Sequence, residues 1–235
     1  MKRVKGSTHL TIELAEIVFS ISSSDCFIDR LEWGENYQNF FSKKEGEVFI
    51  HTHYNEIPTF EFTKNDLVFH SGKIWSLYRW QGKYIFSLKS PTLGPAPYRV
   101  AVFESNFCRG EIYSQVFEYQ GSTGNLSLPN PLEYPLSDVL MVCLLSQGYG
   151  LMLHACGVED DALGYLFLGN STHGKSTIAK LWFENQGTVL NDDRIIVREK
   201  DSEFWMYGTP WHGDYPEVSP QGLPIHKIFF LHHGK

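Results

Sequence analysis

The chain has 235 residues, of which 42% are hydrophobic and 20% charged, as expected of a soluble globular protein with a substantial core. Its net charge of −7 and the lack of a dense Lys/Arg run exclude nucleic acid as the main partner. No stretch approaches about 18 uninterrupted apolar residues, and the basic start lacks an apolar signal segment, so no membrane partner is expected. Four scattered cysteines without a C-x-x-C pair favour reduced thiols and the cytoplasm.

Residues 1–125 are expected to form a β-rich N-terminal module. Short alternating runs recur, and Gly-containing spacers at 71–73 and 81–83 predict hairpin turns between aromatic-rich strands. In chain order, the expected strands cover 11–20, 47–53, 59–63, 67–70, 74–80, 84–88, 100–103 and 111–117. A polar stretch rich in Gly, Ser, Asn and Pro at 120–131 predicts the domain boundary.

Two features of this module allow either a functional or a structural interpretation. His51 and His53 alternate on one strand face and would suit a metal, but no third ligand is evident, which favours an exposed face. An aromatic cluster could be a binding platform, although such residues more often pack across strands. Its members are Trp75, Tyr78, Trp80, Tyr84 and Phe86.

Residues 130–235 are expected to form an α/β nucleotide-binding domain. Helices over 135–146 and 176–185 are predicted among short strands at 151–155, 164–168, 188–190, 194–197, 204–207 and 225–231. Because the chain stops directly after the last apolar strand, this domain is expected to be incomplete at its C-terminus.

A phosphate-binding loop is the most specific motif of the chain. Gly169 to Ser176 read Gly-Asn-Ser-Thr-His-Gly-Lys-Ser and match G-x-x-x-x-G-K-[ST], between an apolar strand and a helix. Loop amides and the helix N-terminus would hold phosphate, Lys175 would reach the β- and γ-phosphates, and Ser176 would bind Mg²⁺. The residues expected to bind ATP are Gly169, Asn170, Ser171, Thr172, His173, Gly174, Lys175, Ser176 and Thr177. The alternative is a Gly-rich turn that binds nothing.

Paired carboxylates follow the next apolar strand, in Asn191-Asp192-Asp193. Together with Ser176, Asp192 and Asp193 are the expected Mg²⁺ ligands, and one of the pair could instead accept a proton from an attacking hydroxyl. The structural alternative is a turn, since Asn and Asp favour turns. A third candidate, His154, lies on an apolar strand, where a histidine alone is more often a packed core side chain.

Together these elements resemble the catalytic domain of the HPr kinase/phosphorylase family, which shares its nucleotide-binding core with ATP-dependent phosphoenolpyruvate carboxykinases. The resemblance rests on His154, the loop Gly169–Ser176 and the run Asn191-Asp192-Asp193-Arg194, and covers roughly residues 150–200. It implies an α/β fold: a C-terminal P-loop kinase core with a mixed sheet, preceded by the β-rich module. It also implies ATP and Mg²⁺ as cofactors, with catalytic roles for Asp192, Asp193, His154 and Lys175.

The sequence also departs from this family. Thr177 follows the loop where the family has Glu, and a turn-rich segment at 208–215 replaces a second family signature. That segment could line an acceptor site or be a structural loop. The expected activity is transfer of the γ-phosphoryl group of ATP to a hydroxyl, on a protein Ser or a small molecule. A catalytically silent ATP-binding sensor and a carboxykinase-like enzyme are the alternatives, and a homo-oligomer is left open.

Overall fold

The computed structural model describes residues 8–24, 31–54, 56–116 and 128–232. The chain divides into two compact units, each assembled from segments that are distant in sequence. The first unit comprises Met1–Ile12, Val18–Trp33 and Lys43–Leu144, and the second comprises Glu13–Ile17, Gly34–Ser42 and Leu145–Lys235. The expected domains 1–125 and 130–235 stay a prediction, and most of the boundary at 120–131 lies outside the described residues.

An eight-stranded mixed sheet forms the first unit, in the order β1-β2-β4-β9-β8-β7-β6-β5. β2, β4 and β9 are parallel neighbours, and the remaining pairs from β9 to β5 are antiparallel. The strands are β1 (His9–Leu14), β2 (Ile17–Ser23), β4 (Val48–Tyr54), β5 (Leu67–His70), β6 (Trp75–Trp80), β7 (Lys83–Leu88), β8 (Arg99–Phe103) and β9 (Arg109–Ser114). β3 (Leu31–Glu32) and β10 (Leu128–Pro129) form a separate parallel pair, and the helices are η3 (Lys64–Asp66) and α1 (Leu136–Leu144).

A closed five-stranded β-barrel forms the second unit. Its ring runs β12-β16-β15-β14-β11 and closes where β11 pairs with β12. Only β12 and β16 are parallel neighbours, and the other ring pairs are antiparallel. The strands are β11 (Leu151–Asp160), β12 (Leu163–Leu168), β13 (Thr188–Asn191), β14 (Arg194–Lys200), β15 (Glu203–Tyr207) and β16 (Gly222–Phe230). The helices are η2 (Glu35–Phe40), η4 (Leu145–Tyr149) and α2 (Lys175–Glu184).

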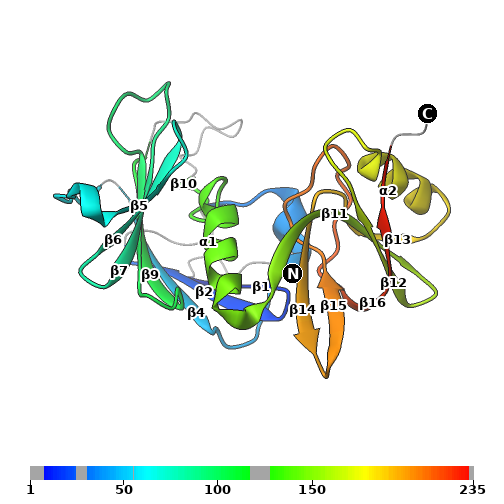
Figure 1. Cartoon of the computed structure of the whole chain (residues 1–235). Coiled ribbons are helices and arrows are strands. Elements are labelled where there is room, and N and C mark those ends of the chain that lie inside the picture. The colour runs from blue at the N-terminus through cyan, green and yellow to red at the C-terminus, as the bar shows by residue number, and fades with distance from the viewer. Residues whose placement is uncertain (1–7, 25–30, 55, 117–127, 233–235) are drawn as a thin grey trace, which may run out of the picture. The chain divides into compact units, whose positions relative to one another are not determined.

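Side chains alternate between the inside and the outside of this barrel, as the period of a strand requires. Ala155, Leu166 and Leu190 belong to one buried cluster with Ile195, Met206 and Leu223. The residues adjacent in sequence to Ala155, Leu166 and Leu190 point to the opposite face of their strands. There they contact α2, which packs against β11 and β13 (Figure 1). This second cluster contains Cys156, Val158, Phe167, Ala179 and Val189.

The expected α/β fold is wrong for this chain, which is 45% strand and 16% helix. Tight two-residue turns replace the helical crossovers that an α/β sheet would need. Asp161-Ala162 joins β11 to β12 and Asp201-Ser202 joins β14 to β15, with positive φ at all four residues. Positive φ at both central residues is the type I′ geometry that twists correctly into an antiparallel hairpin. Because none of the four is glycine, the sequence carries no strong signal for these turns.

Smaller expectations also need correction. The strand predicted over 59–63 is absent, and that segment is irregular up to η3. The single run predicted over 11–20 is two strands separated by Ala15-Glu16. The predicted strand over 111–117 extends beyond β9 to residue 117, which lies outside the described residues. Within the described ranges, no helix has the length and hydropathy needed to cross a membrane.

We expect the barrel interior to dominate the stability of the second unit. Leu166 is fully buried in it, whereas Leu163, on the same strand, is 36% exposed. Leu166→Ala should lower the free energy of unfolding by about 2–5 kcal/mol, because it leaves a cavity. Leu163→Ala is the matched control and should cost less than about 1 kcal/mol. Denaturant unfolding followed by circular dichroism measures both, and equal losses would contradict this barrel interior.

Candidate functional site

The predicted phosphate loop connects β12 to the first turn of α2. Gly174 precedes the helix with φ +92°, and Thr172 within the loop also has positive φ, +71°. No side chain caps the helix N-terminus at Gly174. The first amides of a helix have no partner within it, so those of α2 are available to an anion.

Lys175 lies inside this loop and is only 6% exposed. Its Nζ donates to the carbonyl oxygens of Gly169 and Asn170, at 3.0 and 3.1 Å. An ammonium group has three donors, so one remains for a ligand. Lys175 is therefore already aligned with the loop that would surround a phosphate.

His173 has a different position from the one expected. Its Nδ1 lies 2.9 Å from the carbonyl oxygen of Leu231, directly after β16. The Leu231 amide in turn donates to the Leu168 carbonyl at the end of β12. His173 thus ties the loop to the neighbouring chain, and it is not among the residues that line the cleft beside Lys175.

Asp192 is the point at which three segments meet. Its Oδ2 accepts from Ser176 Oγ at 2.6 Å and from the Tyr215 amide at 3.0 Å, and its Oδ1 accepts from the Gly213 amide at 2.7 Å. The carboxylate is 1% exposed. A Cβ on Gly213 would lie 3.1 Å from Oδ2, so the absence of a side chain there permits this close approach.

The carboxylate pair occupies a bend between two strands. β13 ends at Asn191 and β14 begins at Arg194, and both pair with β11, where Gly157 faces Asn191 and His154 faces Arg194. The buried Asn191 side chain shapes the bend: its Oδ1 accepts from the amides of Asp193 and Arg194, at 2.7 and 2.8 Å. Its Nδ2 donates to the Thr209 carbonyl at 2.8 Å. The Asn-Asp-Asp run thus forms a turn, and this turn is compatible with a role of its carboxylates in binding Mg²⁺ or accepting a proton.

The bend brings His154 to Asp193. His154 Nε2 lies 2.9 Å from Asp193 Oδ1, and Arg194 Nη1 lies 2.8 Å from Asp193 Oδ2. The His154 side chain is 53% exposed and that of Asp193 is 23% exposed. His154 is therefore an accessible histidine with an oriented carboxylate partner and not a packed core residue.

A cleft of about 320 Å³ gathers most of the predicted site. The loop, the bend and β11 contribute to it, and so does the 208–215 segment. Its lining residues are His154, Ser171, Thr172, Gly174, Lys175, Ser176, Thr177, Asp192, Asp193, Gly213 and Asp214. Gly169, Asn170 and His173, which were also predicted to bind ATP, support the loop from outside this lining.

The segment 208–215 lies partly in the cleft and is partly held by η2. Gly213 and Asp214 line the cleft, as an acceptor-site element would. Its first half is held by η2: Trp211 Nε1 donates to Tyr37 Oη at 2.8 Å, and Asn36 Nδ2 donates to the Pro210 carbonyl. Sequence reasoning did not identify Asn36, Tyr37 or Asn191, because their roles depend on residues that are distant in the chain.

The oxygen atoms of this cleft suit Mg²⁺ better than a softer metal. Ser176 Oγ and Asp192 Oδ2 converge at 2.6 Å, and hard cations prefer oxygen ligands. The described part of the chain holds no cluster of three or more His, Cys, Asp or Glu side chains suited to a metal. Mg²⁺ in nucleotide sites takes few protein ligands and completes its shell with phosphate oxygens and water, so this arrangement fits it.

A buried thiol lies beneath the site. Burial, and then the neighbouring Asp192 carboxylate, raises the pKa of Cys156 to about 12. The thiolate is the reactive form of cysteine. Cys156 is therefore a packing residue beside α2 and takes no part in the chemistry of the cleft.

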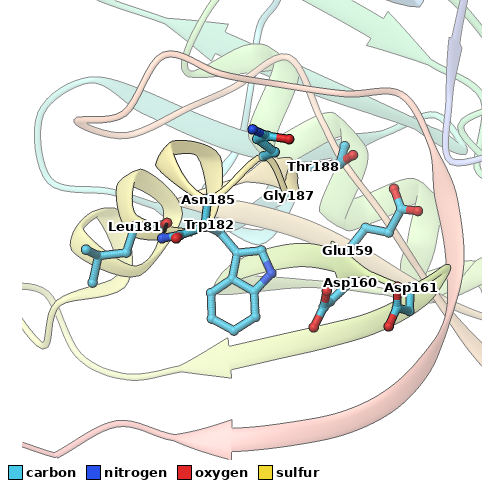
Figure 2. Close-up of a pocket in the computed structure, with 9 residues that line it drawn as sticks. Glu159, Asp160, Asp161, Leu181, Trp182, Asn185, Gly187 and Thr188 are labelled. Carbon is cyan, nitrogen blue, oxygen red and sulfur yellow. Dashed lines mark hydrogen bonds between the residues drawn. The ribbon is translucent and has the colours of Figure 1, made fainter.

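A larger cavity, of about 480 Å³, lies at the opposite end of α2 (Figure 2). Figure 2 shows the indole of Trp182 and the carboxylates of Glu159, Asp160 and Asp161 around the same hollow. These three carboxylates and the negative end of the helix dipole would repel a phosphate. The smaller cleft therefore suits a phosphate better than this cavity does.

No protein-family model matches this chain, and no curated protein matches it significantly.

We expect the Asn191 side chain to maintain the bend. Asn191→Ala leaves the amides of Asp193 and Arg194 without their acceptor, which should lower the free energy of unfolding by about 1–3 kcal/mol. The control is Asn185→Ala on the exposed end of α2, expected to change it by less than about 1 kcal/mol. Chemical denaturation measures both, and an Asn191 variant as stable as the control would contradict this role.

Proposed function

We propose that this protein is an ATP-dependent kinase that transfers the γ-phosphoryl group to a hydroxyl acceptor in the cytoplasm. The observation that carries the proposal is the single cleft shared by the phosphate loop, the Asp192-Asp193 pair and His154. A loop alone indicates phosphate binding; a loop that faces an oriented His–Asp pair also offers a group that can take a proton. Resemblance to HPr kinase/phosphorylase rests on the same residues and is part of the proposal.

The loop side of the cleft would bind the nucleotide. The free amides at the start of α2 and the remaining donor of Lys175 would hold the β- and γ-phosphates. Ser176 and Asp192 would hold Mg²⁺, and Asp193 faces the same cleft. Bound there, Mg²⁺ would neutralise charge on the phosphates.

The two carboxylates have different environments, which supports different roles. Asp192 is buried and already accepts three hydrogen bonds, so it is suited to fix Ser176 and the metal side of the cleft. Asp193 is more exposed and contacts His154. We assign proton handling to the His154–Asp193 pair and positioning to Asp192.

The acceptor hydroxyl would approach His154. When Nε2 donates to Asp193 Oδ1, the neutral imidazole has its lone pair on Nδ1. Nδ1 can then take the proton of the hydroxyl as its oxygen attacks the γ-phosphorus, while the bond to the β-phosphate oxygen breaks and ADP leaves. Asp193 stabilises the resulting imidazolium, as a carboxylate does for a general-base histidine.

We expect Lys175 to control nucleotide affinity. Lys175→Ala removes a charge-assisted hydrogen bond to phosphate and should weaken ATP–Mg²⁺ binding by roughly tenfold to a hundredfold. Lys180→Ala is the matched control, because Lys180 lies on the same helix, is exposed and pairs with Glu184 one turn further along. Isothermal titration calorimetry measures both, and equal affinities would contradict phosphate binding by this loop.

His154→Gln and Asp193→Asn should separate binding from transfer. Both keep a hydrogen-bonding side chain, so ATP–Mg²⁺ affinity should change by less than about threefold. Transfer of labelled γ-phosphate to an acceptor hydroxyl or to water should fall by roughly a hundredfold or more, as expected on loss of a general base. Tight nucleotide binding by the wild type without transfer to any hydroxyl offered would contradict the kinase and favour the silent sensor.

A further inference from the structure

The first unit contains a cavity of its own, of about 450 Å³. Strands β6, β7 and β8 form its floor, and the irregular segment at 57–62 lines another side. On the floor, Tyr78 faces Ile85 across one strand pair, and Ser87 faces Val100 across the next. By strand alternation these four share one face of the sheet, and the core residues Leu77, Phe86 and Ala101 point to the other. The cavity thus lies on the opposite face of the sheet from Leu77, Phe86 and Ala101, and the buried side chains of Ile85 and Val100 form part of its floor.

The aromatic cluster of the first unit serves partly as packing and partly as the lining of this cavity. Phe86 is fully buried and meets Phe103, and Tyr84 stacks on Phe107, so these two pack within the fold. Tyr78 has a different partner: its ring stacks on Phe62, with centroids 3.9 Å apart and planes within 2°. Part of the cluster is cross-strand packing, and part is the wall of a cavity.

The aromatic side chains of the cavity wall contact one another. Phe60 stacks on Phe62 at 5.6 Å and 12°, and Phe60 also meets the edge of Trp80 at 5.3 Å and 77°. Successive parallel rings offer a π-surface to another planar group, and ring-on-ring contacts favour aromatic ligands beyond their area. The volume lies in the range of small-molecule sites.

A polar group inside the cavity lacks a partner. Ser87 is only 7% exposed and lines the cavity, yet its hydroxyl has no hydrogen bond to any residue in the described part of the chain. The hydroxyl is thus open to the cavity, where it can donate to or accept from a polar atom of a ligand.

Lys89, two residues further along, is the one charged side chain among the described residues that line the cavity. It is exposed, as expected at the mouth. The cavity therefore combines an aromatic wall, an inner hydroxyl and a cationic rim.

We propose that this cavity binds a small planar aromatic molecule that carries a carboxylate. The ring system would contact the aromatic side chains of Phe60, Phe62 and Tyr78. The Ser87 hydroxyl would bond to a polar atom of the ligand, and the carboxylate would pair with Lys89. This site is independent of the phosphate cleft and adds a small-molecule ligand to the proposed kinase activity.

The test uses two probes of equal shape, 2-naphthoate and the neutral 2-naphthamide, titrated into the full chain by calorimetry. The wild type should bind one equivalent of 2-naphthoate, about twofold to fivefold more tightly than the amide. Lys89→Met should remove this preference by weakening only 2-naphthoate, since an exposed ion pair contributes about twofold to fivefold. Lys73→Met, an exposed lysine in the turn before β6, is the matched control and should change neither affinity.

Two further variants test the interior. Ser87→Ala should weaken both probes by about twofold to tenfold, and Ala96→Trp, at an exposed lining position, should abolish binding of both. Circular dichroism checks that each variant is folded; should either misfold, the comparison of Lys89→Met with Lys73→Met still decides. Lack of saturable binding by the wild type, equal affinity for both probes, or binding unaffected by these lining variants would overturn the proposal.

Discussion

The Asp192 carboxylate is the contact on which the candidate site depends. Its three hydrogen bonds join the first turn of α2, the bend between β13 and β14, and the segment around Gly213. These segments are separated in the chain, and Asp192 is the one side chain that bonds to Ser176, Gly213 and Tyr215 among the described residues. A buried carboxylate needs several donors to replace its bonds to water. The donors of Asp192 come from segments that line the cleft, so satisfying this carboxylate also holds the cleft together.

The closed barrel explains how that contact is held in place. β11 pairs with β12 on one edge and with β13 and β14 on the other. β11 therefore positions both halves of the site. It holds the start of the phosphate loop through its pairing with β12, and it holds the carboxylate bend through its pairing with β13 and β14. His154 lies on β11 itself, opposite Arg194. A site built on paired strands keeps its side chains in a narrower range of positions than a site built on loops.

The phosphate cleft and the aromatic cavity differ in chemistry, and the local sequence reflects only part of this difference. The cleft beside Lys175 is lined by hydroxyls, amides and charged groups, whereas the cavity beside Ser87 is lined mainly by aromatic and aliphatic side chains. The first follows a sequence motif, and the second does not. Phe60 and Phe62 come from a segment that strand periodicity predicts wrongly, because their rings pack on a neighbouring sheet face and not on strand partners.

The sequence by itself determined the local features: the phosphate loop, the helix after it, the Asp pair and most strands of the first half, since these depend on short-range pattern. The tertiary structure alone decided the closed barrel, because its hairpins turn at Asp161-Ala162 and Asp201-Ser202 without a glycine signal. The tertiary structure alone gave Asp192 and Asp193 different environments, because their burial and their hydrogen-bond partners depend on residues far along the chain. The tertiary structure also joins η2 to the 208–215 segment through the hydrogen bond between Tyr37 and Trp211. These residues are too far apart in the chain for a local sequence pattern to predict their contact.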